Sequence, residues 1–333
     1  TGTTNLHQMQ HYFVDHGLGG IAQAGLLMAL IGVGFKIAAV PMHLYTPDVY
    51  EGSAAPVAAF LAFTPKTAGF VSILLLCATV GWGYGTYAGH ALPEAVRLTL
   101  WVMAALTMTV GNVLAVLQNS VKRILAYSSI AHSGYMLVGV IAGPGDGRSI
   151  TSNGLGAVLF YLLCYGVMNM GCFAVLACLE RRASDGHAHE IETVDDLRGL
   201  CRTHPPLGWT MVLCSLSLMG FPPLLGFLCK LPLFTSIISA GDITLAVVLG
   251  LNSAIAAYYY LRLAWASYLQ EPAPGVPAPH ATPFFSRPFA AMVSAACVVL
   301  LVLAGNALLQ TSNRAGVPEP QPSQQSAAPA QAP

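Results

Sequence analysis

The sequence predicts an all-α integral membrane protein with about eight transmembrane helices, two of them discontinuous. Hydrophobic residues make up 55% of the chain and charged residues only 8%, whereas soluble domains contain about 25% charged residues. The alternating segments of about ten residues that are typical of outer-membrane barrels are absent. Eight apolar runs are long enough to cross about 30 Å of hydrocarbon as helices: 18–40, 56–79, 98–117, 122–142, 154–179, 207–238, 243–269 and 288–310.

The rest of the composition argues against several classes of protein. The net charge is zero and the charges lie almost entirely between the apolar runs, so we expect the lipid bilayer as a partner and no nucleic acid. The eight cysteines include no C-x-x-C pair, and we interpret at least six as small core residues rather than metal or iron–sulfur ligands. The chain starts with Thr and shows no signal peptide, so we expect that it begins partway through a longer protein.

Residues 1–17 are polar and are predicted to form a solvated segment outside the membrane. His7 and His11 have a spacing that a metal site could use, but no carboxylate or cysteine completes a ligand set, so we expect no metal there.

The first apolar run continues past residue 40 as far as Tyr50, which is too long for one straight span of about 20 residues. Proline has no backbone N–H and clashes with the preceding turn, so Pro41 should end or kink the helix about one turn after Lys36. Lys36 is therefore expected near the middle of the membrane, beside unpaired carbonyl groups.

Three of the four lysines, Lys36, Lys66 and Lys230, lie inside long apolar runs. A lysine at the centre of a membrane helix costs about 2.5–3.5 kcal/mol on insertion scales, so it usually faces a hydrated cavity or a proton path. Lys66 has ten residues of the run 56–79 before it and thirteen after it, which keeps its side chain far from either membrane surface. These lysines are our candidate proton-transfer residues.

The runs 98–117 and 122–142 are joined at Lys122 and Arg123, which are expected to mark a cytoplasmic helix end. His132 lies about ten residues into the second of these runs, with several hydroxyl side chains nearby in sequence. Two interpretations stay open, a core histidine held by hydrogen bonds between helices and a proton relay.

Residues 180–204 hold most of the remaining charge and are predicted to be a solvated linker, in which His187, His189 and Glu190 are not expected to bind a metal. The run 207–238 then repeats the pattern of the first run. It is too long for one span, it is interrupted by glycines and prolines between residues 220 and 226, and it carries Lys230. Two long, interrupted segments, each with an intramembrane lysine, are typical of inverted-repeat transporters.

The end of the chain is less informative. Tyr258–Tyr260 are interpreted first as an interfacial aromatic belt and second as part of a pathway. Residues 271–283 are a Pro-rich linker, and residues 311–333 form a Pro-, Gln- and Ala-rich tail that should stay unfolded.

Loop charges predict the orientation. With eight spans both termini lie on one side, and the positive-inside rule places that side outside the cytoplasm. The loops on the other side carry Lys122, Arg123, Arg181, Arg182, Arg198, Arg202 and Arg287, whereas the terminal side carries only Arg97, Arg148 and Arg314.

Five stretches together resemble a known family: FKIAAVPMHLYTPDVYEGSAAPVAAFLAFTPK, VKRILAYSSIAHSGYML, DLRGL, GFPPLLGFLCK and LNSAIAAYYYLR. They are similar to the antiporter-like proton-translocating subunits of respiratory complex I, the NADH-quinone oxidoreductase, and most similar to the N type (subunit 2). The resemblance covers about residues 20–270. It implies a fourteen-helix, inverted-repeat fold, of which this chain would form the C-terminal portion, helices seven to fourteen.

The resemblance also implies roles for single residues. Lys36, Lys66 and Lys230 would match the family's lysines of helices seven, eight and twelve, which form a hydrated proton axis at mid-membrane, and lysine at the last two positions favours the N type. The family's helix-five glutamate, which pairs with the helix-seven lysine, would lie before residue 1. Without that partner, pumping by this chain alone is not expected.

The expected mechanism is proton transfer along water and lysine. The proton affinity of a buried lysine depends on its desolvation and on its distance from a carboxylate. Lys36 would be the switching site, with Lys66 and His132 as relays toward Lys230. By resemblance, quinone, NADH, FMN and iron–sulfur clusters belong to partner subunits of a bacterial inner-membrane complex, and this chain holds no cofactor. The alternatives are a stand-alone or Mrp-like cation/proton antiporter and an inactive structural subunit.

Overall fold

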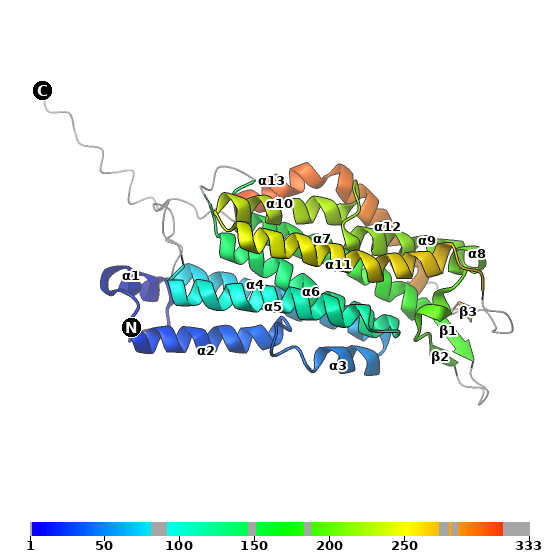
Figure 1. Cartoon of the computed structure of the whole chain (residues 1–333), viewed down its shortest axis with the longest axis horizontal. Helices are drawn as coiled ribbons and strands as arrows, with labels where there is room; N and C mark the ends of the chain where they lie inside the picture. Colours follow the sequence, from blue (N-terminus) through cyan, green and yellow to red (C-terminus); the bar gives the residue numbers. More distant parts are fainter. Residues whose placement is uncertain are drawn as a thin grey trace, which may run out of the picture.

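The structure is a computed structural model, and it describes residues 2–80, 92–145, 151–182, 188–272, 280–281 and 286–315. Its helices run side by side along one direction, with a small sheet at one end of the bundle (Figure 1). We call this the sheet end. It holds β1 (Leu179–Arg182), β2 (Ala188–Glu190) and β3 (His280–Ala281), in the antiparallel order β2-β1-β3.

Six helices in the described part of the chain are long and apolar enough to cross a membrane: α4 (Ala55–Val80), α5 (Glu94–Val116), α6 (Val121–Ala142), α7 (Gly154–Cys178), α11 (Ile243–Tyr268) and α12 (Ser286–Leu303). Three shorter apolar helices accompany them: α2 (Gly20–Lys36), α9 (Pro205–Met219) and α10 (Leu225–Ser239). The long helices lie within four residues of the predicted runs, apart from the end of the last one.

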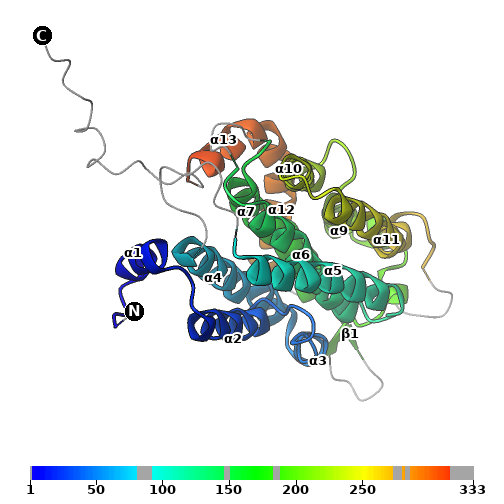
Figure 2. The same ribbon diagram turned by 60° about the vertical axis from the view of Figure 1, so that its left-hand side comes forward.

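Helices α6 and α7 form the centre of the bundle. Seen more nearly end-on, α2, α3 (Thr46–Gly52) and α4 lie on one side of this pair and α5, α9 and α11 on the other (Figure 2). Almost every residue of α6 is buried, whereas α5 and α11 expose apolar side chains such as Leu98 and Leu251. Hydroxyl, histidine and tyrosine side chains on α6 and α7 are thereby placed at the core.

The first predicted break lies earlier than expected, because α2 ends at Lys36 and not one turn after it. Residues 37–45 form turns before α3 begins, and Ala38 has a positive φ of 57°. Some of the carbonyl groups that were expected to be unpaired have partners. Tyr45 donates a hydrogen bond to the Phe35 carbonyl (2.9 Å), and Ser133 of α6 donates one to the Ile37 carbonyl (2.6 Å).

The second interruption separates α9 from α10. Gly220, just after α9, has a φ of +92°, which side chains rarely adopt. The start of α10 then packs tightly against the end of α9, since a Cβ at Gly226 would lie 1.6 Å from the Ser217 carbonyl oxygen. Ser217 Oγ also accepts a hydrogen bond from the Gly226 N–H (3.1 Å).

Several segments that we predicted to lack structure are folded. Residues 6–16 form α1 (Leu6–His16), whose first N–H groups bond to the Asn5 side chain. The linker 180–204 contains β1 and β2, a 3₁₀ turn (η1, Val194–Leu197) and α8 (Leu200–Thr203). These elements are held by pairing with distant residues and by a capping box at Thr193, which the charge-rich composition did not indicate.

The last predicted run is also divided. Helix α12 ends at Leu303 and α13 (Gly305–Ala315) turns onto the start of α7, where Asn153 donates to the Asn313 carbonyl (3.2 Å). Helix α13 thus takes up the first residues of the predicted tail. The rest of that tail, 316–333, and His187 lie outside the described residues, and so do the loop residues 81–91.

Candidate functional site

Lys66 is buried in the middle of α4, and only 3% of the residue is exposed. Its Nζ donates to two atoms of Ser129 on α6, the backbone carbonyl and Oγ, the second at 2.6 Å. The ammonium group also lies 5.0 Å from the ring centre of Tyr165 on α7, a distance at which a cation is attracted to an aromatic face. No carboxylate reaches this lysine among the described residues.

Lys36 lies close to this site in space but is exposed. A Cβ at Gly69 would be 2.4 Å from the Ile37 side chain and 3.7 Å from Lys36 Cβ, so the end of α2 packs on α4 one turn from Lys66. Ser133 bonds to both the Ile37 carbonyl and the Ser129 carbonyl (2.6 and 3.3 Å). The two lysine positions are therefore joined through α6, although Lys36 itself makes no hydrogen bond or ion pair with the described part of the chain.

His132 is at the centre of the bundle and is 1% exposed. Its Nδ1 lies 2.7 Å from the Tyr161 hydroxyl and its Nε2 lies 2.9 Å from the Tyr260 hydroxyl. Tyr260 in turn shares a hydrogen bond with Ser128. Both ring nitrogens are thus occupied by groups that can donate or accept, so the imidazole can change its tautomer without losing a partner.

Lys230 lies on α10, beside the interruption. Its Nζ donates to the Met219 carbonyl at the end of α9 (2.8 Å) and lies 5.1 Å from the ring centre of Tyr135. The ring of Tyr135 also packs edge-on against His132, with 5.5 Å between ring centres. On the other side of the histidine, the Tyr165 ring lies 4.9 Å away.

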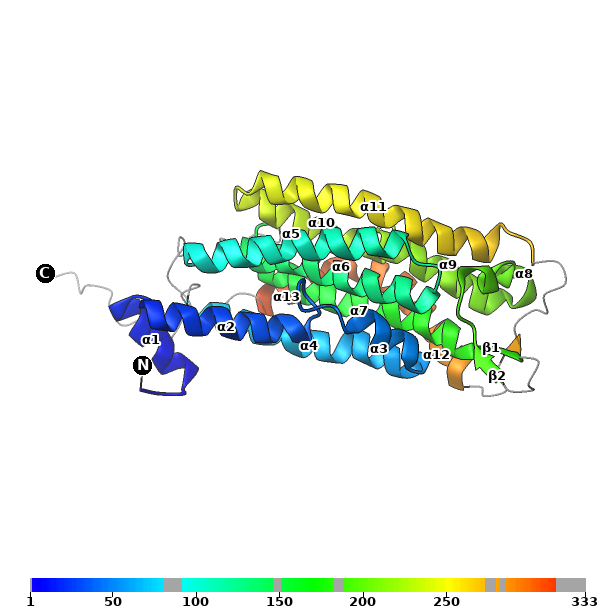
Figure 3. The same cartoon turned by 60° about the horizontal axis from the view of Figure 1, so that its bottom comes forward.

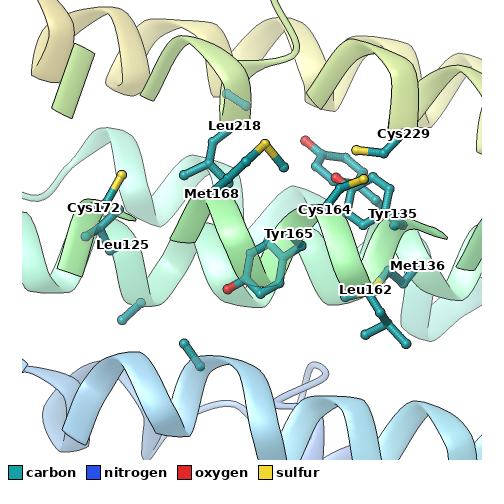
Figure 4. Close-up of a cluster of buried hydrophobic side chains, with 14 of the residues drawn as sticks. Leu125, Tyr135, Met136, Leu162, Cys164, Tyr165, Met168, Cys172, Leu218 and Cys229 are labelled. Carbon is teal, nitrogen blue, oxygen red and sulfur yellow. The ribbon is translucent and has the colours of Figure 1, made fainter. Parts of the chain in front are cut away.

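Three of the four predicted residues are thus arranged in a row. Lys66 and Lys230 each lie over a tyrosine ring, and the two tyrosines contact His132 between them. Lys36 is set apart on an exposed face at one end. Figure 4 shows Tyr135 and Tyr165 at two levels of the core.

Sequence reasoning missed the tyrosines. It interpreted Tyr258–Tyr260 first as an interfacial belt, but Tyr259 and Tyr260 are fully buried and only Tyr258 is exposed. Tyr161 and Tyr165 were not singled out, although their spacing of four residues on a predicted span would have placed them on one face of the helix. Tyrosine is common in membrane proteins, so that spacing alone carried little signal.

A second polar network positions Tyr135. Asn112 of α5 donates to the Tyr135 hydroxyl (2.9 Å) and to Asn252 Oδ1 (3.2 Å), and it accepts from the Tyr259 hydroxyl (2.9 Å). Asn252 continues the network to Thr109 (3.3 Å). Since buried polar groups without partners are costly, these bonds fix the ring beneath Lys230.

The cysteines and histidines outside this row form no metal site among the residues that the structure describes. Cys77, Cys164, Cys172, Cys178, Cys214 and Cys229 are buried, and Cys201 and Cys297 are partly exposed. The groups in the row are amines, an imidazole and hydroxyls, which can bind protons and pass them on.

Residues 1–256 match the family model described as NADH:quinone oxidoreductase/Mrp antiporter, transmembrane. The chain belongs to this family. Subunit N of the NADH-quinone oxidoreductase of Salinibacter ruber is 41% identical over 248 residues, which are 74% of this chain and 46% of that protein. The corresponding subunit of Myxococcus xanthus is 37% identical over 324 residues, 90% of this chain and 60% of that protein. The resemblance to N-type subunits is confirmed.

This chain spans about half the length of the curated relatives that it matches. A chain of respiratory complex I from Thermus thermophilus with bound Aureothin superimposes with a TM-score of 0.72 at 31% identity, over 92% of this chain and 64% of that chain. A chain of the Mrp complex from Dietzia gives 0.76 at 22% identity, over 95% and 62%. The second likeness concerns the fold alone.

Proposed function

We propose that this chain is the proton-translocating C-terminal portion of an N-type membrane subunit of an NADH-quinone oxidoreductase. One observation carries the proposal: the buried Lys66 and the partly buried Lys230 each lie over a tyrosine ring, and both rings contact a buried histidine between them. Intramembrane ionisable groups are functional by default because their burial is costly. The names of the relatives support the same conclusion.

In this proposal Lys66 and Lys230 hold protons in turn. Lys66 binds a proton while its Nζ is held by the two Ser129 acceptors, and the Tyr165 face stabilises the ammonium without a fixed counter-charge. A lysine without a fixed carboxylate can release its proton when a charge approaches or leaves nearby. Lys230 does the same at the end of α9, where the Met219 carbonyl accepts its hydrogen bond.

His132 passes the proton between them. A proton that reaches one ring nitrogen allows the other to release its proton to a tyrosine hydroxyl, and the tyrosine passes on its own proton. The net result moves one proton across the ring and leaves a neutral imidazole of the other tautomer. Ser128 extends the chain of exchangeable groups beyond Tyr260. Reorientation of the hydroxyl groups then restores the starting arrangement.

Lys36 would be the switching site. Its exposed position at the end of α2 leaves it open to a carboxylate from the part of the relatives' length that this chain does not span. Movement of that carboxylate would change the charge felt by Lys66 through the Ser129–Ser133 contacts.

The wider setting is also a proposal. We place the chain in the inner membrane of a bacterium as eight spans of a fourteen-helix fold, with α2–α3 and α9–α10 as the discontinuous helices and both termini outside the cytoplasm. Its partners are the other complex I membrane subunits. NADH, FMN, iron–sulfur clusters and quinone are handled by partner subunits, and quinone reduction there drives the translocation.

The test uses the assembled complex in sealed membrane vesicles, with Lys66→Met and Lys230→Met compared with wild type. Methionine keeps the length of the side chain and removes the proton site. We expect proton uptake per NADH oxidised to fall while both variants assemble. Pumping at the wild-type ratio in both variants would refute the proposal and leave a structural subunit. Sodium-dependent transport without a redox partner would favour the Mrp-like antiporter.

A further inference from the structure

The core face of α7 carries a stripe of side chains that continues past the proposed proton site. Tyr161, Tyr165, Asn169 and Phe173 follow one another at intervals of four residues, so they share one face of the helix. All four are fully buried. At one end of the stripe Tyr161 contacts His132, and one turn further Tyr165 contacts Lys66. At the other end Phe173 packs against Tyr50 of α3, with 6.0 Å between ring centres.

Asn169 is unusual within this stripe. Neither its amide nitrogen nor its carbonyl oxygen has a hydrogen-bond partner among the described residues, and both atoms are inaccessible to solvent. A buried amide without a partner is costly, because it has given up its hydrogen bonds to water. Such groups in proteins are satisfied by buried water, which itself needs two to four polar partners.

Suitable partners lie one turn away. The Tyr165 hydroxyl is also buried without a hydrogen bond of good geometry, and it lies near the Ser129 side chain that accepts from Lys66. In Figure 4 this hydroxyl points along α7 in the direction of Cys172, which is the direction of Asn169 and the sheet end. Tyr50 brings a second hydroxyl to Ser129 from α3.

The facing side of α6 has the matching pattern. Helices α6 and α7 are consecutive and antiparallel (Figure 3), and His132 is level with Tyr161 and Tyr165. Helical rise therefore places Ala126 level with Asn169. Ala126 lies between Ser129 and Lys122 on one face of α6.

This face ends at a second buried lysine that the proposed proton path does not use. Lys122 is 7% exposed. Its Nζ pairs with Glu190 of β2 (2.6 Å) and donates to the Ser53 carbonyl (2.9 Å). Both oxygens of the Glu190 carboxylate also accept a hydrogen bond from the backbone N–H of Ala55, the first residue of α4 (3.1 Å each). Part of the Glu190 side chain reaches solvent.

We propose that Asn169 anchors buried water that carries protons from the Lys122–Glu190 pair at the sheet end to the Lys66–Ser129 pair. The inference rests on the proposed function and adds the uptake route to it. A proton from solvent is taken up at the partly exposed Glu190 carboxylate, moves through the water held by Asn169 and the Tyr165 hydroxyl, and protonates the neutral amine of Lys66. Glu190 regains its charge as the proton leaves.

The distance is compatible with this route. Lys122 and Ser129 are seven residues apart on α6, which corresponds to about 10 Å along the axis. Hydrogen-bonded oxygens are about 2.8 Å apart, so three or four links, of which the Asn169-bound water is the middle one, span the gap.

The test compares three variants in the assembled complex: Asn169→Leu, which fills the site with an apolar side chain, Asn169→Ser, which keeps a polar anchor, and the control Met170→Leu. Met170 is the next residue on α7 but is exposed on the outer face. Two quantities are measured, the protons taken up per NADH oxidised and the infrared band of buried water, recognised by its shift in H₂¹⁸O.

We expect Asn169→Leu to lower the proton ratio by about fivefold or more, as expected for more than 1 kcal/mol of lost stabilisation in the transfer step, and to abolish a water band. Asn169→Ser should keep both, and Met170→Leu should match wild type. A wild-type ratio or an unchanged water band in Asn169→Leu would overturn the route. If Asn169→Leu fails to assemble, Asn169→Ala, which removes the anchor without filling space, decides by the same two measures.

The Lys66→Met variant separates this inference from the proposed function. Loss of pumping in Lys66→Met with normal pumping in Asn169→Leu rejects the uptake route alone. Normal pumping in both rejects the proposed function.

Discussion

Gly220 offers a sharp test of how the interruption between α9 and α10 positions Lys230. Its φ of +92° costs a residue with a side chain about 1–2 kcal/mol. A Cβ there would also lie 3.1 Å from Lys230 Cδ and 3.4 Å from Nζ. The lysine must then move, which weakens the 2.8 Å bond from Nζ to the Met219 carbonyl, a further loss of about 1–2 kcal/mol.

Gly220→Ala is therefore expected to destabilise the fold by about 2–4 kcal/mol, which lowers the melting temperature by about 4–8 °C, and to reduce proton pumping because Lys230 is displaced. The matched control is Gly250→Ala on α11, where a Cβ would meet only Phe234 ring atoms at 3.6 Å and beyond. That variant should match or exceed wild-type stability. Differential scanning fluorimetry and vesicle pumping measure the two effects. A Gly220→Ala protein with wild-type melting and pumping would show that the interruption does not fix Lys230.

Three further outcomes are expected. His132→Phe should abolish pumping while His132→Gln, which can still donate and accept, keeps part of it; equal activity of the two variants, measured as proton uptake, would rule out a relay. Tyr135→Phe keeps the ring beneath Lys230 and should pump at about half of the wild-type proton ratio or better. Tyr135→Leu removes the cation–ring attraction of about 1–2 kcal/mol and should lower the proton ratio about tenfold. A lower ratio in Tyr135→Phe than in Tyr135→Leu would show that the ring does not matter. Burial raises the pKa of the Cys201 thiol in α8, outside the long spans. Because the thiolate is the reactive form, the rate of labelling by a membrane-impermeant maleimide should rise about tenfold per pH unit from neutral pH upward. A labelling rate that does not change with pH would contradict this.

The sequence by itself determined the class of protein and its most informative residues. Four lysines in 333 residues, three of them inside apolar runs, are a local signal, because the cost of burying an amine in a membrane depends on its immediate neighbours in the chain. The ends of α2 and α9 were also predictable within a few residues, since proline and glycine act on their own turn of helix. The short motifs then indicated the family that the comparisons confirmed.

The tertiary structure decided which groups serve those lysines. Lys66 meets Ser129 across 63 residues, and His132 meets Tyr260 across 128, and no local pattern encodes such pairs. The same holds for Glu190, which the sequence placed in a solvated linker and the fold places against Lys122 and the start of α4.

The composition of a segment determines its hydrophobicity, and hydrophobicity identifies the membrane spans. Which face of each span turns inward is set by the packing of all the helices together, and the proton site lies on those inward faces. Lys36 is the clearest example: the sequence predicted it near the middle of the membrane, and in the structure its side chain is exposed on the surface of this chain.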